Sequence, residues 1–230
     1  SGSGKSTLAR TLLRLLEPMD GSIHLDGRDI AHLSEAELRP LRARIQIVFQ
    51  DSQSALNPRR RVGAAIAEPL LAYGRAASFV DALRQAGEVL ERAGLSRDYV
   101  ERFPHELSGG QRQRVGIARA IALQPGLLVA DEIVSGLDVS VQAQILDLLR
   151  RLRAETGLAL VLISHDLSVV RVLCDHVAVM RQGEIVESGR VEDVFREPRH
   201  PYTRKLLRAI PLPEVDPGWI DSMDIEEESV

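Results

Sequence analysis

Residues 127–132 read Leu-Leu-Val-Ala-Asp-Glu, and this stretch decides the fold. Four consecutive apolar residues predict a strand without a polar face, which is typical of a parallel sheet covered by helices on both sides. Asp131 and Glu132 follow at the carboxyl end of that strand, where open α/β sheets place their ligands. An acidic pair at an ordinary strand end is the alternative that this stretch alone leaves open.

Other segments extend the same pattern along the chain. Strands are expected at 45–49, 158–163, 177–180 and 184–186, and helices at 7–16, 111–123, 141–152 and 167–174. Gln182-Gly183 predicts the turn of a hairpin. From 62 to 95 the apolar period is helical throughout, which indicates a mainly helical insert. The sequence therefore predicts an α/β fold with an inserted helical subdomain.

Composition excludes several classes of protein. The chain has 29 Lys and Arg against 33 Asp and Glu, and five of the acids lie in the last ten residues. It lacks the basic excess of a nucleic-acid binder, so no nucleic-acid partner is expected. Cys174 is the single cysteine, which excludes an internal disulfide and a cysteine-rich metal site. The longest apolar run, at 158–163, is far shorter than the ~20 residues that span a bilayer.

The chain begins with Ser1-Gly2-Ser3-Gly4-Lys5-Ser6-Thr7, the end of a phosphate-binding loop G-x-x-x-x-G-K-[ST]. The loop amides and the positive end of the following helix would cradle phosphates. Lys5 would bridge the β- and γ-phosphates, and the Ser6 hydroxyl would bind Mg²⁺. The first glycine of the motif would lie two positions before Ser1, so we interpret the sequence as a piece of a longer protein. The alternative is a flexible Gly-Ser linker.

A second candidate phosphate contact is Leu107-Ser108-Gly109-Gly110-Gln111. A serine and two glycines that open a helix form another oxyanion-binding helix end. A second phosphate contact is redundant within one site. It has a use if it contacts a γ-phosphate that another protomer holds.

This stretch resembles the signature sequence of ABC ATPases, and the neighbouring motifs follow in that family's order. Gln50 resembles the Q-loop glutamine, residues 135–138 resemble the D-loop, and His165 resembles the switch histidine. The resemblance implies ATP and Mg²⁺ as cofactors. It also implies a RecA-like P-loop NTPase core at 1–59 and 127–195.

The resemblance also implies the remaining boundaries and the site residues. The helical subdomain is expected at 60–126, within an ABC ATPase domain of 1–195, and a C-terminal extension at 196–230. The residues expected to contact nucleotide are Ser1, Gly2, Ser3, Gly4, Lys5, Ser6, Thr7, Ser108, Gly109, Gly110, Gln111 and Asp138. The expected Mg²⁺ ligands are Ser6, Gln50 and Asp131, and the expected catalytic residues are Gln50, Glu132 and His165. Glu132 would polarise the attacking water.

Two further stretches narrow the resemblance. Residues 49–58 and 198–203 are similar to the Q-loop stretch and the C-terminal extension of peptide and nickel importer ATPases. This implies an ATP-hydrolysing subunit for uptake of oligopeptides, dipeptides or a similar small solute. The implied partners are permease subunits, a second ATPase subunit and, indirectly, a solute-binding protein. The implied location is peripheral, on the cytoplasmic face of the plasma membrane. A soluble non-transport ABC ATPase and a degraded cassette that binds without turnover are the alternatives.

Two residues depart from the family pattern. Ile133 stands where the family has proline, and Gly136 stands where the D-loop has alanine. Proline would favour an extended conformation of the preceding residue. We therefore expect Ile133 to loosen the Glu132 carboxylate, and Gly136 to add backbone freedom.

Overall fold

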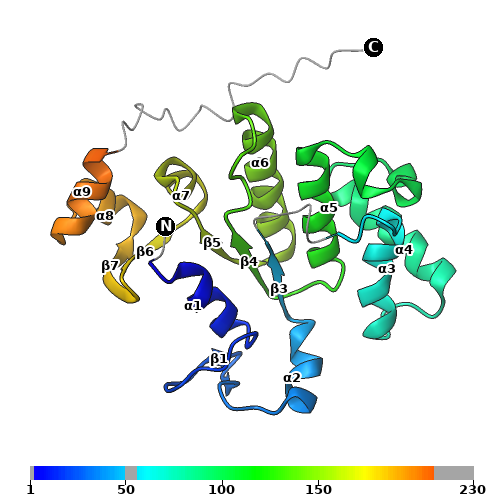
Figure 1. Ribbon diagram of the computed structural model, residues 1–230, viewed down its shortest axis with the longest axis horizontal. Helices are drawn as coiled ribbons and strands as arrows, with labels where there is room; N and C mark the ends of the chain where they lie inside the picture. The colour runs from blue at the N-terminus through cyan, green and yellow to red at the C-terminus, as the bar shows by residue number, and fades with distance from the viewer. Residues whose placement is uncertain (1–2, 50–55, 210–230) are drawn as a thin grey trace. The chain divides into compact units, whose positions relative to one another are not determined.

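The computed structural model describes residues 3–49 and 56–209 and has an α/β architecture (Figure 1). It divides into two compact units, Lys5–Ile163 and Ser1–Gly4 with Ser164–Val230. The helices are α1 Lys5–Leu12, α2 Glu35–Arg42, α3 Val62–Ala72, α4 Phe79–Arg92, η1 Arg97–Glu101, η2 Pro104–Glu106, α5 Gly109–Ile121, α6 Val139–Thr156, α7 Leu167–Leu173, α8 Val191–Arg196 and α9 Pro201–Ala209. The strands are β1 His24–Leu25, β2 Arg28–Asp29, β3 Ile45–Val48, β4 Leu127–Asp131, β5 Ala159–Ile163, β6 His176–Arg181 and β7 Glu184–Arg190.

The centre of the first unit is the parallel sheet β3-β4-β5. Leu127 of the middle strand pairs with Ile45 on one side and with Ala159 on the other. From Leu128 to Asp131 the middle strand is buried, as its unbroken apolar run predicts. The prediction of a parallel sheet around residues 127–132 is confirmed.

Helices cover both faces of this sheet. On one face, Ala9 of α1 and Leu13, the residue that follows α1, pack against Val129 and Ile163 of the sheet. On the other face, a Cβ at Gly116 of α5 would lie 3.7 Å from Val48. Successive strand residues point to opposite faces, and Val48 pairs with Ala130, the neighbour of Val129. The two helices therefore lie on opposite sides of the sheet.

The predicted helix at 7–16 is instead α1, which ends at Leu12. Arg14 lies in the left-handed region, with φ 53°. Its buried guanidinium donates to the carbonyl oxygens of Ile30 (3.1 Å) and Leu33 (3.2 Å). A tertiary contact of this kind overrides the apolar period of the local sequence.

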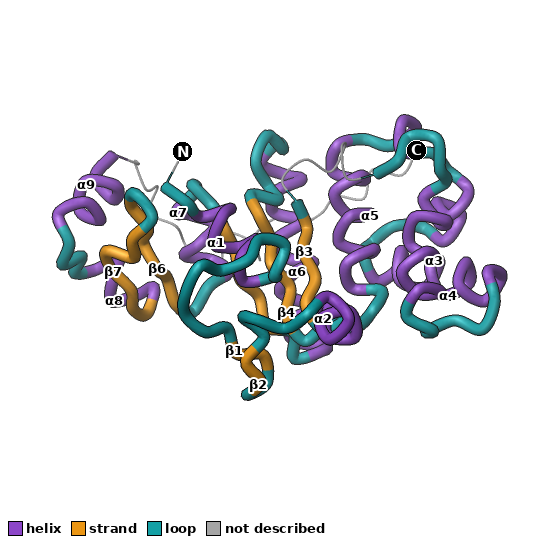
Figure 2. Tube along the Cα trace, turned by 60° about the horizontal axis from the view of Figure 1, so that its bottom comes forward, coloured by secondary structure: helices purple, strands orange, loops and turns teal. Residues whose placement is uncertain are grey.

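The helical insert consists of α3, α4 and the short helices that lead to α5. Figures 1 and 2 both show α3 and α4 side by side. Ile66, Leu70 and Leu90 are fully buried between them and their neighbours. A Cβ at Gly63 would lie only 2.8 Å from Val100 of η1, so glycine allows this close approach.

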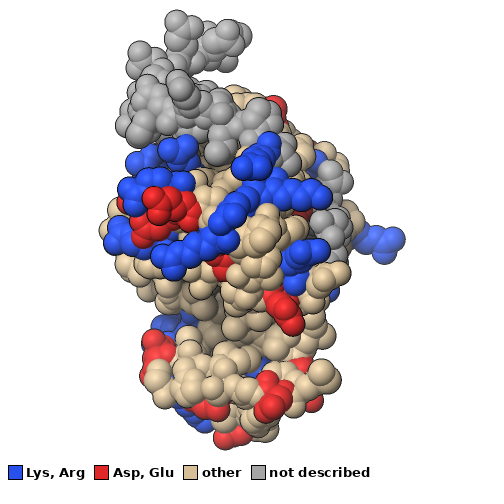
Figure 3. All heavy atoms as spheres, turned by 90° about the vertical axis from the view of Figure 1, so that its left-hand side faces the viewer, with Lys and Arg blue, Asp and Glu red and all other residues tan. Residues whose placement is uncertain are grey.

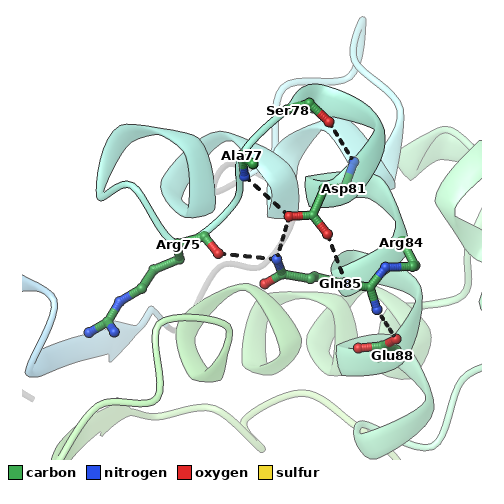
Figure 4. Close-up of polar contacts among 7 residues, drawn as sticks. All are labelled: Arg75, Ala77, Ser78, Asp81, Arg84, Gln85 and Glu88. Carbon is green, nitrogen blue, oxygen red and sulfur yellow. Dashed lines mark hydrogen bonds and ion pairs between the residues drawn. The ribbon is translucent and has the colours of Figure 1, made fainter.

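A polar network holds the turn before α4 (Figure 4). Ser78 is the N-cap and its Oγ accepts from the amide of Asp81 (3.1 Å). The Asp81 carboxylate in turn accepts from the amide of Ala77 (3.2 Å) and from Arg84 (2.8 Å). The hydrogen bond from Arg84 is the main reason that the pKa of Asp81 lies below its ordinary value. The hydrogen bonds of Asp81 thereby connect the N-terminus of α4, which Ser78 caps, to the preceding turn.

The second unit contains the antiparallel hairpin β6-β7, with α7, α8 and α9. Gln182 and Gly183 both have positive φ, 52° and 87°, which suits a two-residue hairpin turn, as predicted. The Glu187 carboxylate of β7 accepts from the amides of Arg199 (2.7 Å) and His200 (3.1 Å). These bonds fasten the segment before α9 to the hairpin.

Helix α9 carries exposed basic residues and no acidic one. Its basic side chains are Arg204, Lys205 and Arg208, and all three are exposed. In Figure 3, which faces α8 and α9, Lys and Arg side chains gather on the surface. The predicted division into 1–59, 60–126, 127–195 and 196–230 stays a prediction, because the compact units follow a different boundary, between Ile163 and Ser164.

Candidate nucleotide site

Ser6 and Asp131, two of the predicted Mg²⁺ ligands, lie in direct contact. The Ser6 Oγ donates to the Asp131 Oδ1 at 3.3 Å, across 125 positions of the sequence. Packing of α1 on the sheet brings them together, because it places the first turn of α1 at the carboxyl end of β4. Lys5 and Ser6 are half-buried there, Asp131 is buried and Thr7 is exposed.

Glu132, the predicted base, has a backbone conformation that is rare for a side-chain-bearing residue. Its φ is 50°, in the left-handed region. The amide of Glu132 donates to the carbonyl oxygen of Ile163 (2.9 Å), and its own carbonyl oxygen accepts from Ser135 (3.0 Å). Ile133 is buried, with 2% of its surface exposed. This conformation lies outside the extended region that a following proline would favour. That Ile133 loosens the Glu132 carboxylate stays a prediction.

The predicted signature residues form a complete helix cap. Ser108 is the N-cap of α5, and its Oγ accepts from the amide of Gln111 (3.3 Å). In return, the Gln111 Oε1 accepts from the amide of Ser108 (3.0 Å). The Gln111 side chain also donates to the Tyr99 hydroxyl at 3.1 Å. Gly109 and Gly110 open the helix, as predicted, so the helix expected at 111–123 begins two residues earlier than those bounds.

Tyr99 is a residue that the sequence does not single out. It lies in a short 3₁₀ helix, in a segment without periodicity that could have pointed to it. Its contact with Gln111 shows that this glutamine side chain is held by the protein itself. The predicted role of Gln111 toward nucleotide stays a prediction.

Asp138 caps the neighbouring helix α6. Its Oδ1 accepts from the amide of Val141 (2.9 Å) and from the Ser140 hydroxyl (2.8 Å). The Val141 amide, and then the Ser140 hydroxyl, hold the pKa of Asp138 below its ordinary value. Its neighbour Leu137 lies against the start of α5, since a Cβ at Gly109 would meet Leu137 at 3.7 Å. The predicted signature and D-loop are thus adjacent.

Three predicted residues belong to the second unit. Ser3 accepts from the amide of Gly183 (3.1 Å), and Gly4 has φ 91°, as a phosphate loop requires of a glycine. His165 is exposed and follows the boundary at Ile163. Its role toward the γ-phosphate stays a prediction. Ser1, Gly2 and Gln50 lie outside the described residues.

The donors at the first turn of α1 fit a magnesium ion chemically. A serine hydroxyl and a carboxylate are hard oxygen ligands, and Mg²⁺ usually takes one or two protein oxygens together with substrate phosphates. Within residues 3–49 and 56–209, no cluster of three or more His, Cys, Asp or Glu side chains could hold a metal. Ser6 and Asp131 therefore suit an ion that arrives with a nucleotide better than a resident one.

Two family models match parts of this chain. Residues 1–135 match the family model of the ABC transporter, and residues 186–229 match that of the oligopeptide/dipeptide transporter C-terminal region. The chain belongs to the ABC transporter family. The first match covers the residues that are predicted to form the phosphate loop, the signature and the carboxylate pair at the end of β4. ATP is the nucleotide that this family of ATPases binds.

Several curated proteins are similar over almost the whole chain. A putative peptide import ATP-binding protein of Brucella ovis is 49% identical over 216 residues, which are 94% of this chain and 68% of that protein. A probable peptide ABC transporter ATP-binding protein of Sinorhizobium fredii is 51% identical over 93% of this chain and 60% of its own length. A glutathione import ATP-binding protein of Pectobacterium atrosepticum is 50% identical over 92% of this chain and 34% of its own length.

Solved structures confirm the fold of this ABC ATPase. A dimeric ATP-binding cassette in a post-hydrolysis state, bound to ADP and Pi, has a TM-score of 0.74 at 32% identity, over 82% of this chain and 81% of that one. CbiO1 of Clostridium perfringens, part of an ABC transporter complex, has a TM-score of 0.76 at 30% identity. The match covers 92% of this chain and 81% of that one. Across the described ranges of this ABC ATPase, no helix combines the length and apolarity needed to cross a bilayer.

Proposed function

We propose that this ABC ATPase hydrolyses ATP to drive the uptake of oligopeptides, dipeptides or a similar small solute. The contact between Ser6 and Asp131 is the observation that carries the hydrolytic part. The match of residues 186–229 to the oligopeptide/dipeptide transporter C-terminal region supports the importer part, as do the peptide and glutathione importers among its relatives.

Each side chain of the site has a distinct task in phosphoryl transfer. The Lys5 ammonium would neutralise charge on the β- and γ-phosphates. Ser6 and Asp131 would hold Mg²⁺, which would supply positive charge to stabilise the negative charge that develops on the phosphates. Glu132 would accept a proton from the attacking water and orient it. The reaction is ATP plus water to ADP plus phosphate, so positioning and charge, rather than a covalent step, provide the catalysis.

Ser108 to Gln111 and Asp138 would act on nucleotide held by a second ATPase subunit. Ser108 and Asp138 are exposed at the adjacent starts of α5 and α6, where a partner can reach them. The dimeric state of a similar cassette supports this arrangement. Permease subunits would convert closure of the pair into transport, and a solute-binding protein would deliver the solute. The subunit would work peripherally, at the cytoplasmic face of the membrane.

The test uses the full-length protein assembled with its permease and partner ATPase subunits in proteoliposomes. We expect ATP-dependent uptake of a labelled dipeptide in the presence of Mg²⁺. Ser6→Ala should lower hydrolysis and uptake together by roughly 10²-fold, since charge stabilisation by the metal is worth several kcal/mol.

Thr11→Ala is the matched control. It removes a hydroxyl one turn further along α1 that donates to the Thr7 carbonyl oxygen (3.0 Å), and it should leave both rates unchanged. Hydrolysis that drives uptake of another solute but no peptide would reject the peptide assignment. Equal rates in Ser6→Ala and wild type would reject the assigned site.

A further inference from the structure

Arg114, in the second turn of α5, donates to two other helices at once. Its Nη1 donates to the carbonyl oxygen of Ala93, the C-cap of α4, at 3.0 Å. Its Nη2 donates to the Gln144 Oε1 of α6 at 2.9 Å. A planar guanidinium with several fixed donors can make two such bonds in different directions, whereas a lysine ammonium presents one point charge.

Gly94 leaves the space that the Arg114 side chain occupies. A Cβ at Gly94 would lie 2.3 Å from the Arg114 Nη1, and Gly94 has φ 75°. Glycine at this position therefore has two roles. It terminates α4 in the left-handed conformation, and it leaves room for the guanidinium of Arg114. The end of α4 is built around this contact.

Two further close approaches lie nearer the first residues of α5, one to α6 and one to the residue before the N-cap of α6. A Cβ at Gly110 would lie 2.5 Å from the Val141 Cγ1, and one at Gly109 would lie 3.7 Å from the Leu137 Cδ2. Together with the bond from Arg114 to Gln144, they define a seam between the two helices. Both residue numbers rise along the seam, so the helices run in the same direction where they touch.

The two contacts of α5 with α6 itself join residues about thirty positions apart, and the two N-caps are separated by the same distance in sequence. Gly110 meets Val141 and Arg114 meets Gln144, while the caps are Ser108 and Asp138. Arg114 and Gln144 are each six residues from their cap, which is about 9 Å along a helix axis. The two N-termini are therefore level. Adjacent parallel helix starts carry like partial charge and repel each other, and the hydrogen bond from Arg114 to Gln144 opposes that repulsion.

Charges on α6 surround this tether. Asp147 and Arg151, which form an ion pair of their own at 3.1 Å, lie on the same face as Gln144. Burial of the Arg114 guanidinium is the main cause that lowers its pKa; the charge of Arg151 acts in the same direction and that of Asp147 opposes it. The arginine keeps its charge at every physiological pH.

We propose that Arg114 is a positioning residue for ATP hydrolysis, which holds the starts of α5 and α6 level so that Ser108 and Asp138 meet nucleotide as one surface. The inference rests on the proposed function, since the nucleotide is the one held by the second subunit. The Arg114 guanidinium is bonded to Ala93 and Gln144, so Arg114 would act through the helices and not by contact with the nucleotide. Its bond to Ala93 also links this surface to the helical insert.

The experiment compares Gln144→Ala, Gln144→Glu, Arg114→Ala and the Arg114→Ala/Gln144→Ala double variant in the assembled full-length complex. Gln144 is exposed, so its removal spares the fold. We expect Gln144→Ala to lower kcat about three- to tenfold with KM unchanged, and Gln144→Glu to keep wild-type kcat, because a charge-assisted bond replaces the neutral one. The double variant should be no slower than Arg114→Ala alone. Arg84→Ala, an arginine with exposed ion pairs on α4, should leave kcat unchanged.

A second readout does not depend on turnover. Without nucleotide, Gln144→Ala should accelerate amide hydrogen exchange at Val141 and Gln142, whose N–H groups are bonded to Asp138. If Gln144→Ala lowers the melting temperature but leaves kcat and amide hydrogen exchange unchanged, the bond between Arg114 and Gln144 has only a structural role. That result would overturn the inference. Additive losses in the double variant would overturn it as well. A wild-type complex without hydrolysis would reject the proposed function, while the exchange measurement would still decide whether Arg114 holds the seam.

Discussion

Glu132 combines two features that rarely meet in one residue, a candidate catalytic carboxylate and a left-handed backbone with φ 50°. Such a conformation costs about 1 kcal/mol or more in a residue with a side chain, and strained residues of this kind cluster at functional sites. The bond between its amide and Ile163 of β5 offsets part of that cost. Ile133 permits the conformation, whereas a proline there would disfavour it.

Glu132→Gln tests the assigned base. The amide keeps the shape of the side chain but cannot accept the proton, so ATP binding should persist while turnover falls about 10²–10⁴-fold. Binding is measured with a fluorescent ATP analogue and turnover by phosphate release, both on the full-length assembled protein. Glu155→Gln, on the exposed surface of α6, is the matched control and should change neither. Near-normal turnover in Glu132→Gln would remove Glu132 from its role.

At the scale of the elements, the first two glycines of α5 stand in different surroundings. Gly110 is buried and faces Val141 of α6 so closely that a Cβ would lie 2.5 Å away. Gly109 is half-buried, and a Cβ added there would make only ordinary van der Waals contact, at 3.7 Å from Leu137. Neither has a positive φ, so the backbone of both accepts alanine. The packing of α5 on α6 therefore requires a residue without a side chain at position 110 but not at position 109.

We expect Gly110→Ala to destabilise the protein by about 1–3 kcal/mol, the usual cost of overpacking. Gly109→Ala should be neutral or slightly stabilising, because alanine is the better helix former. Val141→Ala, added to Gly110→Ala, should recover part of the loss by making room. Urea unfolding midpoints at constant slope measure all three. Equal destabilisation by both single variants would contradict the close packing of α5 on α6 along the seam.

At the scale of the whole molecule, the candidate residues divide between two compact units. Lys5, Ser6, Asp131 and Glu132 lie in the first, and His165 follows directly after the boundary at Ile163. The first unit itself presents two groups, one at the carboxyl end of the sheet and one at the starts of α5 and α6. The proposed site shared between two subunits would give each group a nucleotide to contact.

Ser108→Arg tests that sharing. Ser108 is exposed at the start of α5, so a larger side chain there should block a partner's nucleotide and leave the subunit's own site intact. We expect cooperative hydrolysis by the assembled complex to disappear while the ATP affinity of the isolated full-length subunit stays nearly unchanged. Ser78→Arg removes the equivalent N-cap from α4 and controls for the lost cap, which is worth about 0.5–2 kcal/mol. Loss of ATP affinity in the isolated subunit would refute the shared site.

The amino-acid sequence by itself determined the features that depend on neighbouring residues. The apolar run at 127–130 predicts a buried parallel strand, and Gln182-Gly183 predicts the hairpin turn, because side-chain alternation and backbone preference are local properties. The start of α5 at Ser108 follows from capping chemistry in the same way. The family resemblance then predicted roles for residues that no local pattern explains, and those roles stay predictions.

The tertiary structure alone decided which distant residues meet. The contact of Ser6 with Asp131 spans 125 positions and requires α1 to pack on the sheet, and the end of α1 at Leu12 depends on the bonds of Arg14 to the loop around Ile30. No pattern in the sequence predicts that Arg114 contacts Ala93 at the end of α4 and Gln144 of α6. The physical reason is common to all three. A hydrogen bond between elements depends on how whole helices pack, and packing is set by the sum of many apolar contacts rather than by the residues beside the donor.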